Sequence, residues 1–117
     1  MRSVSYALPW VAVLSADCAA VGVDIEPIDR VIDERVARFV RAQGEPMIDL
    51  LTLWTIKEAA YKADPVSRDL TAYVVTGDTC RTPSGALLRI ATLTHRGLRI
   101  SVAVLPDPIY PTTKEAR

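Results

Sequence analysis

The residues best suited to chemistry in this chain of 117 residues lie in two short segments, 21–27 and 54–63. The first segment reads VGVDIEP, an alternation of apolar and other residues that is typical of a strand. Successive side chains of a strand point to opposite faces. Asp24 and Glu26 are therefore expected together on one face, while the three branched apolar residues between and before them face a core.

The second segment reads WTIKEAAYKA, which predicts a helix. Glu58 and Lys62 are four residues apart and share one face of such a helix, with Lys57 one step round it. If the strand packs beside this helix, the carboxylates of Asp24, Glu26 and Glu58 converge near two ammonium groups. Carboxylate oxygens suit Mg²⁺, and lysines neutralise phosphate oxygens. The pattern thus predicts a site for magnesium and a phosphate-rich ligand.

Each segment alone has a simpler interpretation. Charged residues at the end of a strand commonly serve only to keep a sheet edge from aggregating. An exposed pair such as Glu58 and Lys62 commonly contributes about 0.3–0.5 kcal/mol to a helix and nothing more. Trp54 is expected in the core. The occurrence of both segments in one chain favours the site over these alternatives.

Together the two segments resemble the paired signature of the 4′-phosphopantetheinyl transferases. In that family a strand carries Gly-Val/Ile-Asp-Ile-Glu, and a later helix carries Trp/Phe-x-x-Lys-Glu-Ala-x-x-Lys. Residues 22–26 and 54–62 match these patterns, and the resemblance runs from about Ser3 to about Leu105. It implies Mg²⁺-dependent transfer of the phosphopantetheine arm of coenzyme A to a serine hydroxyl of an acyl or peptidyl carrier protein, with release of 3′,5′-ADP.

The resemblance also assigns roles to individual residues. Asp24, Glu26 and Glu58 would hold Mg²⁺. Lys57 and Lys62 would contact phosphate oxygens of coenzyme A, and Lys62 would also help the leaving group. Glu58 would accept the serine proton, alone or through a metal-bound water, and the identity of the base stays open.

Two departures from the family concern the coenzyme A pocket and the length of the chain. Members usually carry Ser-His in the strand before the acidic motif, with the histidine on a coenzyme A phosphate. Ser5 and Tyr6 stand there in this sequence, and a tyrosine can hydrogen-bond a phosphate but carries no positive charge. Members of the surfactin-synthetase-activating type are two fused halves, and the motifs here resemble the second half.

The length is similar to that of the holo-acyl-carrier-protein synthases, which bind coenzyme A between the subunits of a trimer. We therefore expect a homo-oligomer, either a dimer or a trimer, because symmetric closure would bury the faces that a lone half leaves exposed. A separately encoded partner subunit is the alternative.

A basic segment is the candidate docking surface for the carrier protein. Helical spacing predicts a helix over about 31–42, with Arg35, Arg38 and Arg41 on one side, opposite its apolar residues. Arg30 is a further candidate. Carrier proteins are typically acidic, and a chain with zero net charge and one basic helix would steer such a partner without binding anionic surfaces in general.

The hydrophobic pattern predicts an α+β domain, and the resemblance implies the transferase fold, an antiparallel sheet packed on two main helices. Strands are expected at about 4–6, 10–14, 19–26, 72–76, 87–93 and 98–105, and helices at about 31–42 and 46–63. Residues 1–105 are expected to form this single domain. Residues 106–117 contain three prolines and are expected to form a flexible tail.

Composition excludes several other classes. The net charge of zero supplies no cationic excess for general nucleic-acid binding. No apolar stretch is long enough to span a bilayer, the N-terminus does not read as a signal peptide, and two cysteines are too few for a disulfide framework or a zinc site. We expect a cytoplasmic protein with neither a membrane nor a nucleic-acid partner. A non-catalytic relative that binds a carrier protein, coenzyme A or another subunit is the second function class left open.

Overall fold

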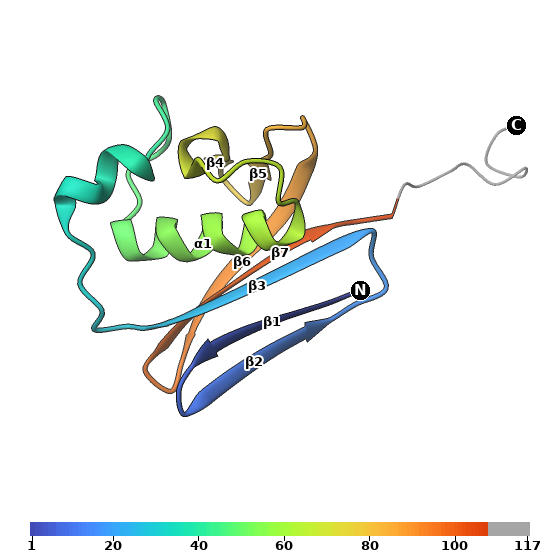
Figure 1. Cartoon of the computed structure of the whole chain (residues 1–117), viewed down its shortest axis with the longest axis horizontal. Helices are drawn as coiled ribbons and strands as arrows, with labels where there is room; N and C mark the ends of the chain where they lie inside the picture. The colour runs from blue at the N-terminus through green and yellow to red at the C-terminus, as the bar shows by residue number, and fades with distance from the viewer. Residues whose placement is uncertain (108–117) are drawn as a thin grey trace, which may run out of the picture.

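A five-stranded antiparallel sheet and one α-helix make up most of the computed structural model, which describes residues 1–107. The helix α1 (Leu50–Ala63) packs across one face of the sheet, whose strand order is β3-β7-β6-β5-β4 (Figure 1). The strands are β3 (Ala20–Pro27), β4 (Val74–Thr76), β5 (Thr79–Arg81), β6 (Leu87–His95) and β7 (Leu98–Leu105). The predicted α+β class and antiparallel sheet are confirmed.

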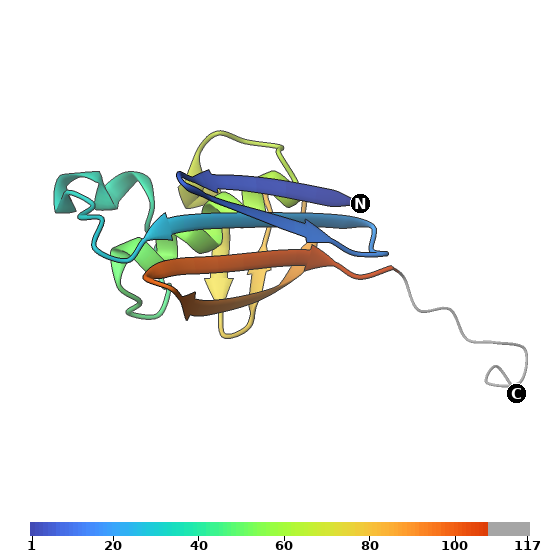
Figure 2. The ribbon, with the colours of Figure 1, turned by 90° about the horizontal axis from the view of Figure 1, so that it is seen from below.

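A separate two-stranded hairpin lies along β3, on the side away from α1 (Figure 2). It consists of β1 (Arg2–Ala7) and β2 (Trp10–Ser15), which pair with each other and join neither end of the five-stranded sheet. The Ser3 hydroxyl accepts the Val23 N–H at 3.0 Å, and the Ser5 hydroxyl accepts the Ile25 N–H at 3.1 Å. Serine side chains thus replace ladder hydrogen bonds where β1 runs beside β3.

Close packing of β3 on α1 brings the two motif segments together. A Cβ on Gly22 would lie 1.9 Å from the carbonyl oxygen of Ala59, so only glycine permits this approach. Because side chains alternate along a strand, Asp24 and Glu26 share the Gly22 face, which is the face that α1 covers. The three branched residues of β3 are buried as expected, on the opposite face: Val21, Val23 and Ile25.

The prediction of two main helices is wrong, because the segment at 31–42 does not form an α-helix. Its middle part is a short 3₁₀ helix, η1 (Glu34–Phe39), in which no residue is buried. The Asp33 side chain caps η1 by accepting the Arg35 N–H at 2.9 Å, which leaves residues 31 and 32 outside it. Burial of an apolar face is what stabilises most protein helices, and Phe39 is exposed here.

Smaller differences concern where elements begin. The helix α1 starts at Leu50 and not near Pro46, because the Asp49 carboxylate caps it by accepting the Thr52 N–H at 3.0 Å. A second 3₁₀ turn, η2 (Leu70–Ala72), precedes β4, and the sequence did not predict β5. No helix within residues 1–107 is both long and apolar enough to cross a membrane. Most of the predicted tail, from residue 108 onward, lies outside the described residues.

Candidate functional site

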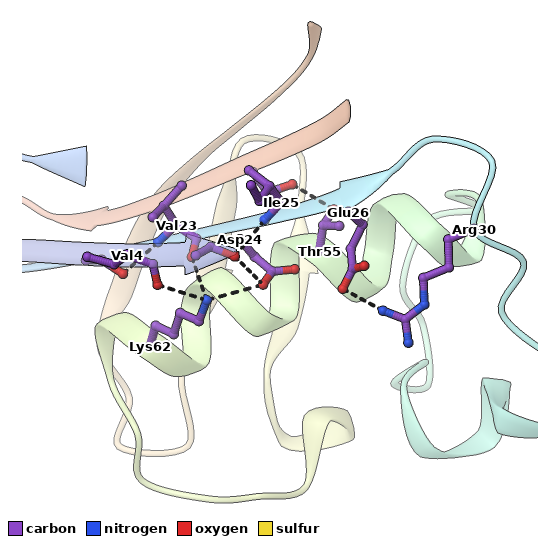
Figure 3. Close-up of polar contacts among 11 residues, drawn as sticks. Val4, Val23, Asp24, Ile25, Glu26, Arg30, Thr55 and Lys62 are labelled. Atoms are coloured by element: carbon purple, nitrogen blue, oxygen red, sulfur yellow. Dashed lines mark hydrogen bonds and ion pairs between the residues drawn. The ribbon is translucent and has the colours of Figure 1, made fainter. Parts of the chain in front are cut away.

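The acidic strand and the Lys-Glu helix lie side by side, with Lys62 bridging three elements (Figure 3). Its ammonium nitrogen Nζ lies 3.3 Å from Asp24 Oδ1 and 2.9 Å from the carbonyl oxygen of Val23 in β3. The same nitrogen lies 3.4 Å from the carbonyl oxygen of Val4 in β1. The structure thus brings Lys62 to the carboxylate face, as the spacing predicted.

Asp24 is the most buried carboxylate of the cluster, with 7% of the residue exposed. Its Oδ1 accepts hydrogen bonds from the Ser5 hydroxyl at 3.3 Å and from Lys62, whereas its buried Oδ2 has no hydrogen-bond partner. Burial raises the pKa of Asp24 to about 6, against the lowering effect of Lys62 and with smaller contributions from Glu26 and Glu58. An unpaired buried oxygen is costly unless a proton or a cation satisfies it.

Glu26 is held by Arg30, which the sequence predicts only as a further docking candidate. The Arg30 guanidinium forms a 2.6 Å ion pair with Glu26 and lies 5.5 Å from the ring centroid of Trp54 in α1. The four-residue separation from Glu26 is the only sequence signal of this contact, and it is weak because the intervening chain is not helical.

Glu58 connects the charged cluster to a cavity. Burial raises the pKa of Glu58, Lys62 lowers it, and Glu26 raises it, so all three groups lie within electrostatic range of one another. Glu58 also lines a cavity of about 410 Å³ between η1, α1 and η2, whose walls include Phe39, Tyr61 and Arg68. No local sequence pattern predicts this cavity, because its walls come from separate segments.

Lys57 does not join the cluster. Its ammonium group is fully buried, donates to the carbonyl oxygen of Val40, and forms a 2.8 Å ion pair with Glu45. Glu45 also accepts the N–H groups of Ala42 at 2.6 Å and Val75 at 2.7 Å. The predicted contact between Lys57 and phosphate is therefore not part of the site as the structure arranges it.

Ser5 and Tyr6, the two predicted coenzyme A contacts in β1, lie in different surroundings. The Ser5 hydroxyl is buried and hydrogen-bonded to both Asp24 and the backbone of β3, so it orients the acidic motif. Tyr6 is 67% exposed, and its side chain is accessible to a ligand.

The predicted docking arginines are only partly brought together. Arg35 and Arg38 are exposed and lie on one side of η1, because a 3₁₀ helix has three residues per turn. Arg35 pairs with Asp33 at 2.7 Å, and the Arg38 guanidinium stacks 4.7 Å from the Phe39 ring centroid. Arg41 lies beyond the end of η1 and is half-buried.

Within residues 1–107, no three His, Cys, Asp or Glu side chains are already arranged around a single metal position. In this cluster, Lys62 and Arg30 each hold one of the three carboxylates by an ion pair. The donor set nevertheless fits Mg²⁺, which takes oxygen ligands, and the unpartnered Oδ2 of Asp24 is an oxygen that such an ion would satisfy.

No protein-family model matches the chain, and no curated protein is similar to it in sequence.

Proposed function

We propose that this chain is a cytoplasmic, Mg²⁺-dependent 4′-phosphopantetheinyl transferase with the fold of that superfamily. It moves the phosphopantetheine arm of coenzyme A to a serine hydroxyl of an acyl or peptidyl carrier protein and releases 3′,5′-ADP. The observation that carries the proposal is the junction of β3 and α1, where Lys62 pairs with Asp24 and the buried Asp24 Oδ2 has no hydrogen-bond partner. Glu26 and Glu58 lie within electrostatic range of Asp24. Phosphate-transfer enzymes act mainly by positioning the reactants and neutralising their charge, and these groups suit both tasks.

The residues of the cluster divide the work of the reaction. Asp24, Glu26 and Glu58 would hold Mg²⁺, which when bound would neutralise charge on the pyrophosphate. The serine oxygen attacks the β-phosphorus, and the bond from that phosphorus to the bridging oxygen of 3′,5′-ADP breaks. Glu58, whose pKa is raised by burial, accepts the serine proton, and Lys62 donates hydrogen bonds to the phosphate oxygens as the leaving group gains charge.

The cavity beside Glu58 suits the pantetheine arm. Its volume is about 410 Å³, and aromatic and aliphatic side chains such as Phe39, Trp54 and Tyr61 form its walls. An arm bound there buries its methylene and methyl groups, and Arg68 offers donors to its amide oxygens. The phosphate end of the arm would then lie next to Glu58.

The carrier protein is proposed to dock on η1. Arg35 and Arg38 present two exposed guanidinium groups on one side of this element. An acidic carrier helix would be attracted to them. Because the chain as a whole has zero net charge, it would not bind other polyanions non-specifically.

Self-association, as a dimer or a trimer, is proposed to occur through the β1–β2 hairpin. Residues 3–16 include no charged side chain, and Leu8, Val11 and Val13 are each more than half exposed. Exposed sheet edges are usually guarded by charges, and this one is not. Light scattering should show an oligomer that V11K reduces toward the monomer mass; a wild-type chain that is monomeric at all concentrations would overturn this part of the proposal.

The transfer itself is tested by intact-mass spectrometry of a panel of apo carrier proteins incubated with this protein, coenzyme A and Mg²⁺. We expect one carrier to gain a single phosphopantetheine arm. EDTA and each of Asp24→Ala, Glu58→Ala and Lys62→Ala should abolish the gain. Asp78→Ala, which removes an exposed carboxylate outside the cluster, is the control and should leave it unchanged. Full activity in all three cluster variants would refute the assigned site.

The second candidate is a non-catalytic module that binds a carrier protein, coenzyme A or a partner subunit. The observation that favours the module is that few side chains remain to contact phosphate. Tyr6 stands where the family has a histidine, and Lys57 is buried in an ion pair with Glu45. Carrier binding that is independent of Mg²⁺, with no transfer to any carrier, would support the module over the enzyme.

A further inference from the structure

Two cationic side chains already neutralise most of the charge that would attract a metal ion. Lys62 pairs with Asp24 at 3.3 Å, and Arg30 pairs with Glu26 at 2.6 Å. Glu58 lies within electrostatic range of both cations. Three carboxylates and two cations leave the cluster with one net negative charge instead of three.

Arg30 is placed to leave Glu26 without disturbing the core. Its side chain is 43% exposed, whereas that of Glu26 is only 15% exposed. Its guanidinium lies over the ring of Trp54, and Trp54 also lines the cavity next to Glu58. Arg30 does not line the cavity itself, but its guanidinium lies against a residue of the cavity wall and can turn from Glu26 toward an anionic ligand bound beside Glu58. Lys62, with 30% of its side chain exposed, has similar freedom.

Charge balance makes the binding of a divalent cation and of an anion depend on each other. A doubly charged ion that enters the cluster alone must separate Glu26 from Arg30 and share Asp24 with Lys62, and the two displaced cations then repel it. A diphosphate that arrives with the ion gives both cations new partners. Arginine suits this exchange because its planar fork can hold either a carboxylate or a phosphate by paired hydrogen bonds.

We propose that Arg30 and Lys62 are built-in counter-ions that a complex of Mg²⁺ with a diphosphate displaces as one unit. The carboxylates pass to the metal, and the two cations pass to phosphate oxygens. The inference rests on the proposed function for the class of ligand, and it adds Arg30 as a phosphate-binding residue that the transferase motifs do not include. Mg²⁺ and diphosphate accordingly bind with positive cooperativity, which by linkage is the same whichever binds first.

Isothermal titration calorimetry tests this inference with MgCl₂ and inorganic pyrophosphate as the probes. For the wild-type chain we expect pyrophosphate to bind at least tenfold more tightly in excess MgCl₂ than in EDTA. Arg30→Gln should shift two affinities in opposite directions: MgCl₂ alone binds at least threefold more tightly, because Glu26 is released, and pyrophosphate in MgCl₂ binds at least threefold more weakly. A residue that only stabilised the local fold would not produce opposite shifts.

Arg89→Gln is the matched control, because it removes an exposed, ion-paired arginine outside the cluster and should leave both affinities unchanged. The inference is overturned if the wild-type chain shows no cooperativity, or if Arg30→Gln leaves the affinity for MgCl₂ alone unchanged or weaker. Since these titrations contain neither coenzyme A nor a carrier protein, their outcome is separate from that of the transfer assay. If Mg²⁺ and pyrophosphate bind cooperatively but no carrier protein is modified, only the proposed function is refuted. If a carrier protein is modified but Arg30→Gln changes neither affinity, only the inference is refuted.

Discussion

Helix α1 contributes one lysine to each of two lysine–carboxylate pairs. The two pairs differ in how completely their charged groups are buried and hydrogen-bonded. In the closed pair, Lys57–Glu45, both side chains are buried, the ions are 2.8 Å apart, and each glutamate oxygen accepts a backbone N–H. In the open pair, Lys62–Asp24, the ions are 3.3 Å apart, 30% of the lysine side chain is exposed, and one aspartate oxygen has no partner. The pKa of Asp24 is raised to about 6 by burial.

The difference indicates what each pair is for. The closed pair ties the loop after η1 to α1 and to β4, and it leaves nothing for a ligand to satisfy. The open pair keeps an unmet hydrogen-bonding need beside two further carboxylates and a cavity. Unfavourable groups of this kind persist in folded proteins mainly where function requires them. We therefore propose a structural role for Lys57 and a catalytic role for Lys62, although both come from the same ten-residue motif.

The largest expected effect on stability comes from breaking the closed pair. Lys57→Met leaves the Glu45 carboxylate buried without its counter-ion, which should lower the free energy of unfolding by about 3–5 kcal/mol. Urea denaturation measures this loss. In the double variant Lys57→Met/Glu45→Gln no buried charge remains, so a substantial part of the loss should be recovered. A Lys57→Met protein as stable as the wild type would contradict the structural role.

Breaking the open pair should instead affect the reaction. Lys62→Met removes a donor to the phosphate oxygens, and transfer should fall by about 100- to 1,000-fold. Because the lysine is partly exposed and the Asp24 carboxylate that it leaves can take up a proton near pH 6, the free energy of unfolding should fall by less than in Lys57→Met. The mass-spectrometric transfer rate and a denaturation curve on one preparation give both numbers. A large loss of stability with little loss of rate would place Lys62 in the same class as Lys57.

The smallest expected effect is a pH dependence of stability that arises from Asp24 in the open pair. The pKa of Asp24 is raised from 3.8 to about 6 on folding, so its contribution to stability is greatest at low pH and is lost as the pH rises through about 6. Since one pKa unit is 1.36 kcal/mol, the wild type in EDTA should lose about 1–2 kcal/mol between pH 5 and pH 8 relative to Asp24→Asn. Denaturation of both proteins at the two pH values measures the difference. If the free energy of unfolding of both proteins changes equally between the two pH values, the pKa of Asp24 is not raised on folding.

Local patterns were enough to predict which face of its own element each residue of the open pair occupies. Alternation along β3 placed Asp24 and Glu26 on one face, and four-residue spacing placed Lys62 on the face of Glu58. The α+β class followed from the same periodicities. These predictions succeeded because each depends on residues within one element.

The closed pair and the second helix could not be predicted in this way. The direction of Lys57 is decided by Glu45, twelve residues earlier in an irregular loop, and by the Val40 carbonyl at the end of η1. The helical spacing at 31–42 was present, but Val40 is the only fully buried residue of that stretch, and Phe39 stays exposed. Tertiary context thus overrides local pattern at both places.

The most direct test of the account is the binding of coenzyme A measured by calorimetry, with and without Mg²⁺, to the wild type, Asp24→Asn and the exposed control Asp78→Asn. We expect the wild type and Asp78→Asn to bind coenzyme A much more tightly when Mg²⁺ is present, and Asp24→Asn to lose at least tenfold of that affinity while remaining folded. Mg²⁺-independent binding by the wild type, or equal binding by Asp24→Asn, would contradict the claim that the open pair is the functional one.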